Sequence, residues 1–274
     1  MLIACVQTDI TFADVSANLT RVLHWIERAA AAKADLVVLP ECMLCGYAFD
    51  SRSQAGEQAL SLRDPLFQQL AQSAKTHQLH ITVGFLEIEG DRLFNASALV
   101  GPQGVVGRYR KIHLPYMGLD RFVDRGDVPY QAYQAGDARI GLAVCYDSSF
   151  PEPMRVLGLA GADVIALGTN WPVGAMRTAE LVPPARSMEN HLFFVAANRV
   201  GCEGGFDFCG RSSICGPDGV VLAKSDSDHE EMLLAEIDVA QARNKLIERV
   251  PGKHVIHRFN DRRPEFYQEI SQPR

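Results

Sequence analysis

The chain has 274 residues, of which 47% are hydrophobic and 22% charged, which is ordinary globular composition and enough for one sizeable core. The net charge of −6 arises from interspersed acids and bases, which excludes a basic surface for nucleic acid or membrane and favours a small-molecule partner. The chain has 7 cysteines, an odd number, which favours reduced thiols over a disulfide framework. It has no basic segment before the apolar N-terminus and no apolar run long enough to span a membrane, so we expect a cytoplasmic protein.

The first half of the chain alternates strand and helix periodicity, which predicts a βαβ unit followed by antiparallel strands. Apolar side chains recur at helical spacing in residues 15–33, and Asp64-Pro65 has the pattern of a helix N-cap and first helical residue. The predicted elements are strands at 2–8, 35–40 and 79–88, strands within 93–111 that are joined by a turn at 101–104, and helices at 15–33 and 64–78.

The second half repeats this alternation. Its predicted elements are strands at 139–147, 163–170, 192–200 and 231–238, a hairpin at 211–225, and helices at 151–160, 178–191 and 238–248. The similar order of elements in the two halves predicts a layered α/β domain with a duplicated sheet.

Two segments lack a regular pattern. Residues 112–138 show no strong periodicity and are predicted to be a long functional or covering loop. Residues 250–274 mix aromatic side chains with arginine and histidine, and we expect this C-terminal tail to pack on the subunit or at a dimer interface. Since the chain contains no linker or low-complexity tract, residues 1–274 are predicted to form a single domain.

Reactive side chains follow several of the predicted strands. Buried strands of α/β sheets deliver functional groups at their carboxyl ends, where side chains meet in a crevice. Here these ends are followed by Glu41, Lys111 and Cys145, and by the pair Asn170-Trp171. A carboxylate, an ammonium and a thiol at equivalent places predict a common site.

These three groups can form a working nucleophile. A thiol with a pKa near 8.5 is mostly protonated at neutral pH, so a catalytic cysteine needs a base or a neighbouring cation. We expect Glu41 to take the proton of Cys145 and Lys111 to stabilise the resulting anion. Lys111 and the backbone N–H of Tyr146 can then face the negative charge that develops on the substrate.

Alternative interpretations exist for each residue. A single strand-end cysteine is more often a small buried hydrophobic side chain, and a single Glu or Lys there is more often solvated. Cys42 and Cys45 form a C-x-x-C that is compatible with a redox pair or half a zinc site, although we favour packing and expect no metal. His113 is interpreted as a group that orients Glu41 or caps the loop, not as a catalytic base.

Four residues near these strand ends are candidates for substrate binding. Tyr47, Tyr146 and Trp171 are predicted walls of the crevice, and Asn170 is a candidate hydrogen-bonding partner of the substrate. Each has a structural alternative, as a core aromatic residue or as a turn-stabilising amide.

Three sequence blocks carry a resemblance to a known family. The chain resembles the nitrilase (carbon–nitrogen hydrolase) superfamily, whose glutamate, lysine and cysteine motifs are similar, in the same order, to "VVLPECMLCGY", "GRYRKIHLP" and "CYDSSFPE". Further similarity in "ADVIALGTNWP", "ARSMENHLFFVAANRVG" and "FCGRSSICGPDG" extends over nearly the whole chain.

The resemblance implies an α-β-β-α sandwich in which helices flank two central mixed sheets. It also implies pairing with a second subunit to form an α-β-β-α-α-β-β-α homodimer, which can assemble further into a higher homo-oligomer. The implied reaction is hydrolysis through an acyl-enzyme without a metal or other cofactor. On this reading Glu41 is the base, Lys111 stabilises the oxyanion and Cys145 is the nucleophile.

One position departs from the family's pattern. Many members carry a second glutamate in the loop after the lysine motif, and "GLDRFVDRGD" aligns Asp120 with it. Because aspartate is one methylene shorter, either the loop approaches more closely or this position is weakened. A surface carboxylate paired with Arg121 or Arg125 is the alternative.

The sequence favours an amidase-like hydrolase that releases ammonia from a small amide. A nitrilase acting on a small nitrile and an N-carbamoyl amidohydrolase remain open, because thiolate attack begins each of these reactions. A catalytically silent binding protein of the same fold is the alternative from a different class.

Overall fold

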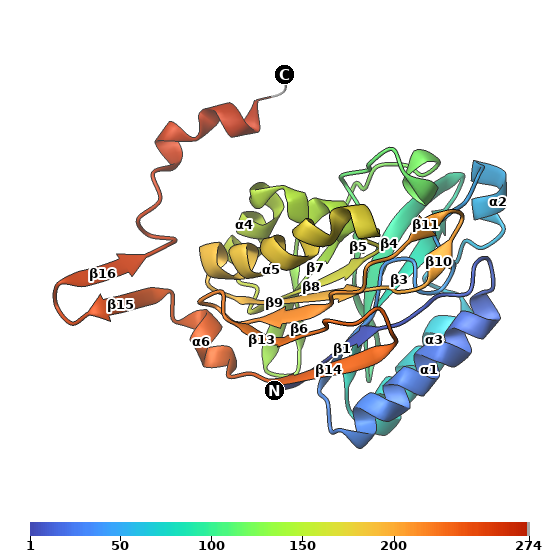
Figure 1. Ribbon diagram of the computed structural model, residues 1–274, viewed down its shortest axis with the longest axis horizontal. Coiled ribbons are helices and arrows are strands. Elements are labelled where there is room, and N and C mark those ends of the chain that lie inside the picture. Colours follow the sequence, from blue (N-terminus) through green and yellow to red (C-terminus); the bar gives the residue numbers. More distant parts are fainter. Residues whose placement is uncertain (273–274) are drawn as a thin grey trace.

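Two six-stranded sheets form the centre of the molecule, as the computed structural model of residues 1–272 shows (Figure 1). In the first sheet three parallel strands, β1, β2 and β3, are extended by antiparallel partners on both sides. Its strands, in sheet order, are β14 (Glu231–Glu236), β1 (Leu2–Gln7), β2 (Leu36–Val38), β3 (His80–Glu89), β4 (Arg92–Gly101) and β5 (Gly104–Arg110).

The second sheet repeats this plan with three parallel strands, β7, β8 and β9, at its centre. Its strands, in sheet order, are β13 (Val221–Lys224), β12 (Ser213–Cys215), β9 (Phe193–Asn198), β8 (Val164–Thr169), β7 (Ala138–Val144) and β6 (Ala132–Ala135). The duplicated sheet predicted from the order of elements is therefore present.

The two sheets pack face to face, and each carries helices on its outer face (Figure 1). Alternation along β1 illustrates the layers: Ile3 and Cys5 belong to the core shared with the second sheet, whereas Ala4 and Val6 belong to the core beneath α1 and α3. The prediction of two mixed sheets flanked by helices is confirmed.

The helices begin where the sequence supplies caps. Asp14 accepts a hydrogen bond from Ala17 N at the start of α1, and Asp64 accepts one from Leu66 N at the start of α3, followed by Pro65 as predicted. The α-helices are α1 (Val15–Ala31), α2 (Arg52–Gly56), α3 (Pro65–His77), α4 (Pro151–Leu159), α5 (Met176–Asn190) and α6 (Val239–Arg243).

Three predicted elements differ from the structure. The helix expected at 238–248 stops at Arg243, because residues 246–250 pair with 254–257 as the hairpin β15 (Leu246–Val250) and β16 (His254–His257). The loop expected at 112–138 contains the edge strand β6, which pairs with β7. The strand expected at 139–147 ends at Val144, and Cys145 opens a 3₁₀ turn instead.

Shorter elements complete the chain. A small hairpin, β10 and β11, contacts the segment after β2, where Tyr47 N donates to Glu203 Oε1 at 2.6 Å. The C-terminal segment after α6 extends away from the sandwich (Figure 1). No helix within residues 1–272 is long and apolar enough to cross a membrane. These remaining elements are β10 (Cys202–Glu203), β11 (Phe206–Asp207) and the 3₁₀ turns η1 (Gly118–Arg121), η2 (Cys145–Ser149), η3 (Val173–Ala175), η4 (Pro264–Phe266) and η5 (Gln268–Ser271).

Candidate active site

Glu41 lies in a tight turn between the two sheets. The turn follows β2 and packs so closely against β3 that a Cβ atom on Gly84 would lie 2.5 Å from Cys42 N and 2.6 Å from Pro40 O. Only glycine leaves room for this backbone contact. The carboxylate of Glu41 is consequently 1% exposed, in the space where the carboxyl ends of both sets of parallel strands meet.

Lys111 lies between two carboxylates. Its Nζ atom, which is fully buried, donates to Glu41 Oε1 at 2.7 Å and to Asp120 Oδ2 at 2.5 Å. Burial acts to lower the pKa of Lys111, but Asp120 and Glu41 outweigh it and raise the pKa well above the usual value. The side chain is therefore a permanent ammonium at neutral pH.

Asp120 reaches this site through η1. Besides Lys111, its carboxylate accepts hydrogen bonds from Tyr47 Oη at 2.7 Å and from Asn95 Nδ2 at 2.9 Å. Asp120 is 4% exposed, and the surface pairing with Arg121 or Arg125 considered above is absent from its bonds. Of the two outcomes considered for the shorter side chain, the structure has the closer approach of the loop.

Asn95 is a member of the site that sequence reasoning missed. It lies in β4, and its Nδ2 atom bridges Glu41 Oε1, at 2.7 Å, and Asp120 Oδ1, at 2.9 Å. A polar residue within the apolar strand "LFNASALV" was the available signal. By donating to both carboxylates, this amide holds two like charges close to one ammonium.

One oxygen of Glu41 remains free. Oε1 accepts from both Lys111 and Asn95, whereas the buried Oε2 has no hydrogen-bond partner. Burial raises the pKa of Glu41, Lys111 opposes this rise and Asp120 adds to it. Among the described residues Glu41 thus presents a buried oxygen without a partner, and the raised pKa makes this carboxylate a stronger base.

Cys145 occupies a strained turn at the end of β7. Its backbone has φ +44°, which is unusual for a residue other than glycine. Two contacts hold the turn: Ser148 Oγ donates to Cys145 O at 2.7 Å, and Val144 N donates to Asp147 Oδ2 at 3.0 Å. The turn places the thiol at the strand end, where it is 9% exposed.

The thiol of Cys145 is protonated at rest. Burial and the charge of Glu41 raise its pKa to about 12, although Lys111 acts in the opposite direction. Since the lysine already compensates two carboxylates, a resting thiolate would add a second uncompensated charge. Lys111 thus acts on the thiol in the expected direction, but burial and Glu41 outweigh it.

Asp147 joins the cysteine turn to the lysine segment. Its Oδ1 atom accepts from His113 Nδ1 at 2.7 Å and from His113 N at 3.3 Å, while Oδ2 accepts from Val144 N. His113 therefore does not orient Glu41, which corrects the first of the two roles considered for it. It binds the carboxylate of Asp147 instead and ties the segment after Lys111 to the turn of Cys145.

The predicted substrate-binding residues fall into different settings. Asn170 is 2% exposed and both of its amide atoms lack partners, as expected of a group that awaits a ligand. Trp171 is buried and anchored through its backbone N–H to Asn198, and the hydroxyl of Tyr47 is occupied by Asp120. Tyr146 is 39% exposed and packs its ring edge against Phe150.

The C-x-x-C pair is part of the core. Cys42 and Cys45 are free thiols with no exposed surface. The described part of the chain contains no group of three or more histidine, cysteine, aspartate or glutamate side chains arranged to hold a metal ion. Both side chains pack in a buried cluster with Tyr47, Phe49 and Leu86, which fits the interpretation that they are packing residues.

The family of the chain follows from comparison with known proteins. Residues 2–245 match the model of the carbon-nitrogen hydrolase family, and the chain belongs to that family, within the nitrilase superfamily. It is an enzyme of the class that hydrolyses carbon–nitrogen bonds.

Relatives with curated descriptions include amidases and nitrilases. The chain is 36% identical to a nitrilase of Pyrococcus abyssi over 97% of its own length and 98% of the relative's. It is 35% identical to an (R)-stereoselective amidase of a Pseudomonas species over 83% and 81%.

Among solved structures, the amidase from Nesterenkonia sp. AN1 is similar. A variant of it that carries the acetamide moiety of fluoroacetamide at its active-site cysteine matches with a TM-score of 0.82 and 25% identity, over 98% of this chain and 96% of that one.

The close packing at Gly84 makes a first prediction. Gly84→Ala places a methyl group against the backbone of the Glu41 turn, so we expect the free energy of unfolding to fall by about 1–3 kcal/mol and the hydrolytic activity to fall with it. Thermal melting and ammonia release measure the two effects. Gly174→Ala, where nothing lies within 4 Å of the new Cβ, is the matched control and should leave both unchanged.

The link through Asp147 makes a second prediction. Asp147→Asn keeps the volume of the side chain but replaces one acceptor oxygen by an NH2 group. This group then faces Val144 N–H or His113, both of which are donors, so we expect the turn of Cys145 to shift. We expect kcat to fall by about 100-fold, with KM changed much less. Asp226→Asn, at an exposed pair with Lys224, should retain the full rate. An Asp147→Asn enzyme with unchanged kcat would show that the link is dispensable.

Proposed function

We propose that the protein hydrolyses the carbon–nitrogen bond of a small aliphatic amide through a thioester on Cys145, with release of ammonia. The free Oε2 atom of Glu41 is the observation that carries this proposal. A buried carboxylate with one uncommitted oxygen and a raised pKa is the base that a thiol with a pKa of about 12 requires.

In the first half-reaction, the sulfur of Cys145 attacks the carbonyl carbon of the amide while its proton passes to Glu41 Oε2. The negative charge that forms on the substrate oxygen faces Lys111 Nζ and the backbone N–H of Tyr146. The tetrahedral intermediate collapses as Glu41 returns the proton to the leaving nitrogen. Ammonia departs, and the acyl group remains on the sulfur.

In the second half-reaction, Glu41 takes a proton from a water molecule that attacks the thioester. The carbon–sulfur bond breaks, the proton returns to the sulfur and the carboxylic acid leaves. Glu41 thus acts as base and acid in turn while Lys111 stays charged throughout. Asp120 is assigned to this machinery because it shares Lys111 with Glu41 at hydrogen-bond distance.

The substrate is proposed to be small. This is supported by the Nesterenkonia amidase, a variant of which carries the acetamide moiety of fluoroacetamide at its active-site cysteine. We assign Asn170 to hydrogen bonding of the substrate, because its buried amide has no partner among the described residues. Tyr47, Tyr146 and Trp171 are assigned to the walls of the pocket.

A direct test uses Cys145→Ala with a panel of short amides, ω-amides, carbamoyl compounds and nitriles. We expect wild-type protein to release ammonia from a short amide and Cys145→Ala to release none, with an unchanged melting temperature. Cys202→Ala, which alters an exposed thiol, is the matched control and should keep the wild-type rate. Turnover by Cys145→Ala would end the proposal.

The same panel decides between the alternatives. Turnover confined to nitriles would make the protein a nitrilase, and turnover confined to carbamoyl compounds an N-carbamoyl amidohydrolase. No turnover and no covalent adduct with any compound would indicate a silent binding protein.

We further propose that residues 1–274 act as one domain whose tail, from residue 250 onward, packs against a second copy in a cytoplasmic homodimer. Exposed apolar side chains support the pairing; they lie on α4 and α5 and in the tail, and include Val156, Leu159, Leu181, Phe266 and Ile270. The 7 free cysteines support a reducing compartment.

Sedimentation velocity tests the pairing. Phe266 and Ile270 are 71% and 66% exposed in the single chain, and a dimer interface would bury them. Phe266→Asp combined with Ile270→Asp should therefore shift the dimer towards monomer. Val105→Asp, at an exposed apolar residue near the start of β5, should leave it intact. A wild-type protein that sediments as a monomer would overturn this part of the proposal.

A further inference from the structure

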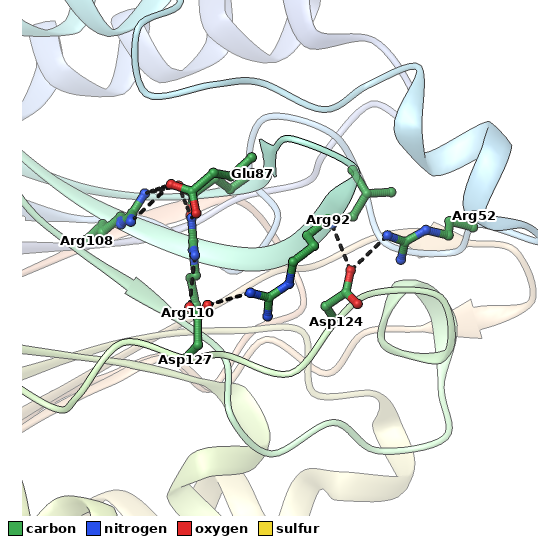
Figure 2. Close-up of polar contacts among 9 residues, drawn as sticks. Arg52, Glu87, Arg92, Arg108, Arg110, Asp124 and Asp127 are labelled. Atoms are coloured by element: carbon green, nitrogen blue, oxygen red, sulfur yellow. Dashed lines mark hydrogen bonds and ion pairs between the residues drawn. The ribbon is translucent and has the colours of Figure 1, made fainter.

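The loop that carries Asp120 is held by a ladder of ion pairs, which we define as Arg52, Glu87, Arg92, Arg108, Arg110, Asp124 and Asp127 (Figure 2). Three of its arginines, Arg92, Arg108 and Arg110, come from β4 and β5, and Arg52 comes from α2. Two of its acids, Asp124 and Asp127, come from the loop itself, so the ladder connects the sheet to the loop.

The inner part of the ladder is buried. Arg110 is 1% exposed and precedes Lys111 directly; its Nε atom donates to Glu87 Oε2 at 2.7 Å and its Nη1 atom to Asp127 Oδ1 at 2.9 Å. Glu87 is equally buried and also pairs with Arg108. Arg110 Nη2 also pairs with Glu89 Oε2 at 3.0 Å, so this buried guanidinium has three carboxylate partners. These partners fix its position and thereby that of Lys111, the next residue in the chain.

The outer part of the ladder lies along the loop. Arg92 Nη1 pairs with Asp127 Oδ2 at 2.7 Å, and Arg52 Nη2 pairs with Asp124 Oδ2 at 2.8 Å. The same Asp124 oxygen accepts from Leu93 N at 2.9 Å. Arg110 and Arg92 lower the pKa of Asp127, and at Asp124 Arg52 and the backbone N–H of Leu93 outweigh burial and lower the pKa. Both carboxylates therefore stay ionised to a lower pH than usual.

Backbone contact completes the attachment. Gly126 N donates to Lys111 O at 2.9 Å, and a Cβ atom at Gly126 would lie 2.1 Å from Arg110 O. The loop thus lies directly on the strand end that supplies Lys111. This close approach lets an aspartate at position 120, with its short side chain, bind Lys111 Nζ at 2.5 Å.

We infer that the ladder positions Asp120 against Lys111 and Glu41, and that Arg110, Asp124 and Asp127 are positioning residues for the hydrolysis. This inference rests on the proposed function, because it assigns Asp120 to the same machinery. The ion pairs of the ladder, which do not touch the reacting atoms, then influence the base strength of Glu41 through the position of Asp120.

The charge of Asp120 acts on Glu41. The titratable groups that face Glu41 are Lys111 from the end of β5, Asp120 from η1, Cys42 and Tyr47 from the segment after β2, and Cys145 from η2. Among them Asp120 raises the pKa of Glu41, whereas Lys111 lowers it. Withdrawal of Asp120 therefore lowers the pKa of Glu41 and makes it a weaker base.

The experiment compares wild-type protein with Asp127→Asn, Asp120→Asn and the double variant, using propionamide as substrate. Asp127→Asn keeps the size of the side chain but removes the charge that binds Arg110 and Arg92. We expect a fall in kcat of about tenfold or more. We also expect the acid limb of the profile of kcat/KM against pH to move to lower pH, because the base is weaker.

The double variant separates positioning from general destabilisation. If the ladder acts through Asp120, the kcat of the double variant is little lower than that of Asp120→Asn alone. The acid limb of the double variant then lies at the same pH as that of Asp120→Asn. The inference would be overturned if the losses of kcat in the two single variants were additive in the double variant while the acid limb of Asp127→Asn stayed at the wild-type pH. Arg177→Gln, at an exposed ion pair on α5, is the control and should match the wild type.

Hydrogen exchange provides a readout that does not depend on turnover. We expect the backbone amides of residues 118–124 to exchange faster in Asp127→Asn than in wild-type protein, whereas unchanged exchange would overturn the inference whatever the activity. The two proposals fail in different ways. Wild-type protein that releases no ammonia contradicts the proposed function, whereas an active Asp127→Asn enzyme with wild-type kinetics contradicts only the role of the ladder.

Discussion

A fully buried ammonium between two carboxylates is the interaction on which the site depends. Lys111 binds Glu41 and Asp120 at the same time, and Asn95 donates to both acids from the side. Removal of three charges from water is costly unless each is paired and hydrogen-bonded, so the surrounding structure has to hold every partner in place. The glycine contact beneath the Glu41 turn and the clamped loop of Asp120 are two consequences of this constraint.

The distribution of charge also determines how the nucleophile works. Since one ammonium compensates two carboxylates, the site already carries a net negative charge before Cys145 ionises, and the thiol stays protonated. In the proposed reaction, such a thiol reacts only when a substrate brings an electrophilic carbon and a developing negative charge to Lys111. The proposal therefore depends more on the strength of the base than on a stable thiolate, and it assigns that base to the Glu41 oxygen that has no partner among the described residues.

Each group assigned to the proposed reaction enters the site from a different element. Glu41 and Lys111 follow strands of the first sheet and Asp120 lies in the covering loop, whereas Cys145 follows a strand of the second sheet. The face-to-face packing of the sheets consequently assembles the site, and contacts such as that between His113 and Asp147 connect its two halves. The family membership of the chain and the amidase and nitrilase descriptions of its relatives agree with this arrangement.

The sequence by itself determined the alternation of strands and helices, the two similar halves and the three motif residues at strand ends, because periodicity and local order carry this information. It did not reveal Asn95, the link from His113 to Asp147, the edge strand β6 or the hairpin β15–β16, since each depends on a partner distant in the chain. Only the tertiary structure decided that Asp120 reaches Lys111 and that Cys145 rests as a thiol. Both outcomes follow from burial and from the summed charge of residues that meet in space, which no local pattern encodes.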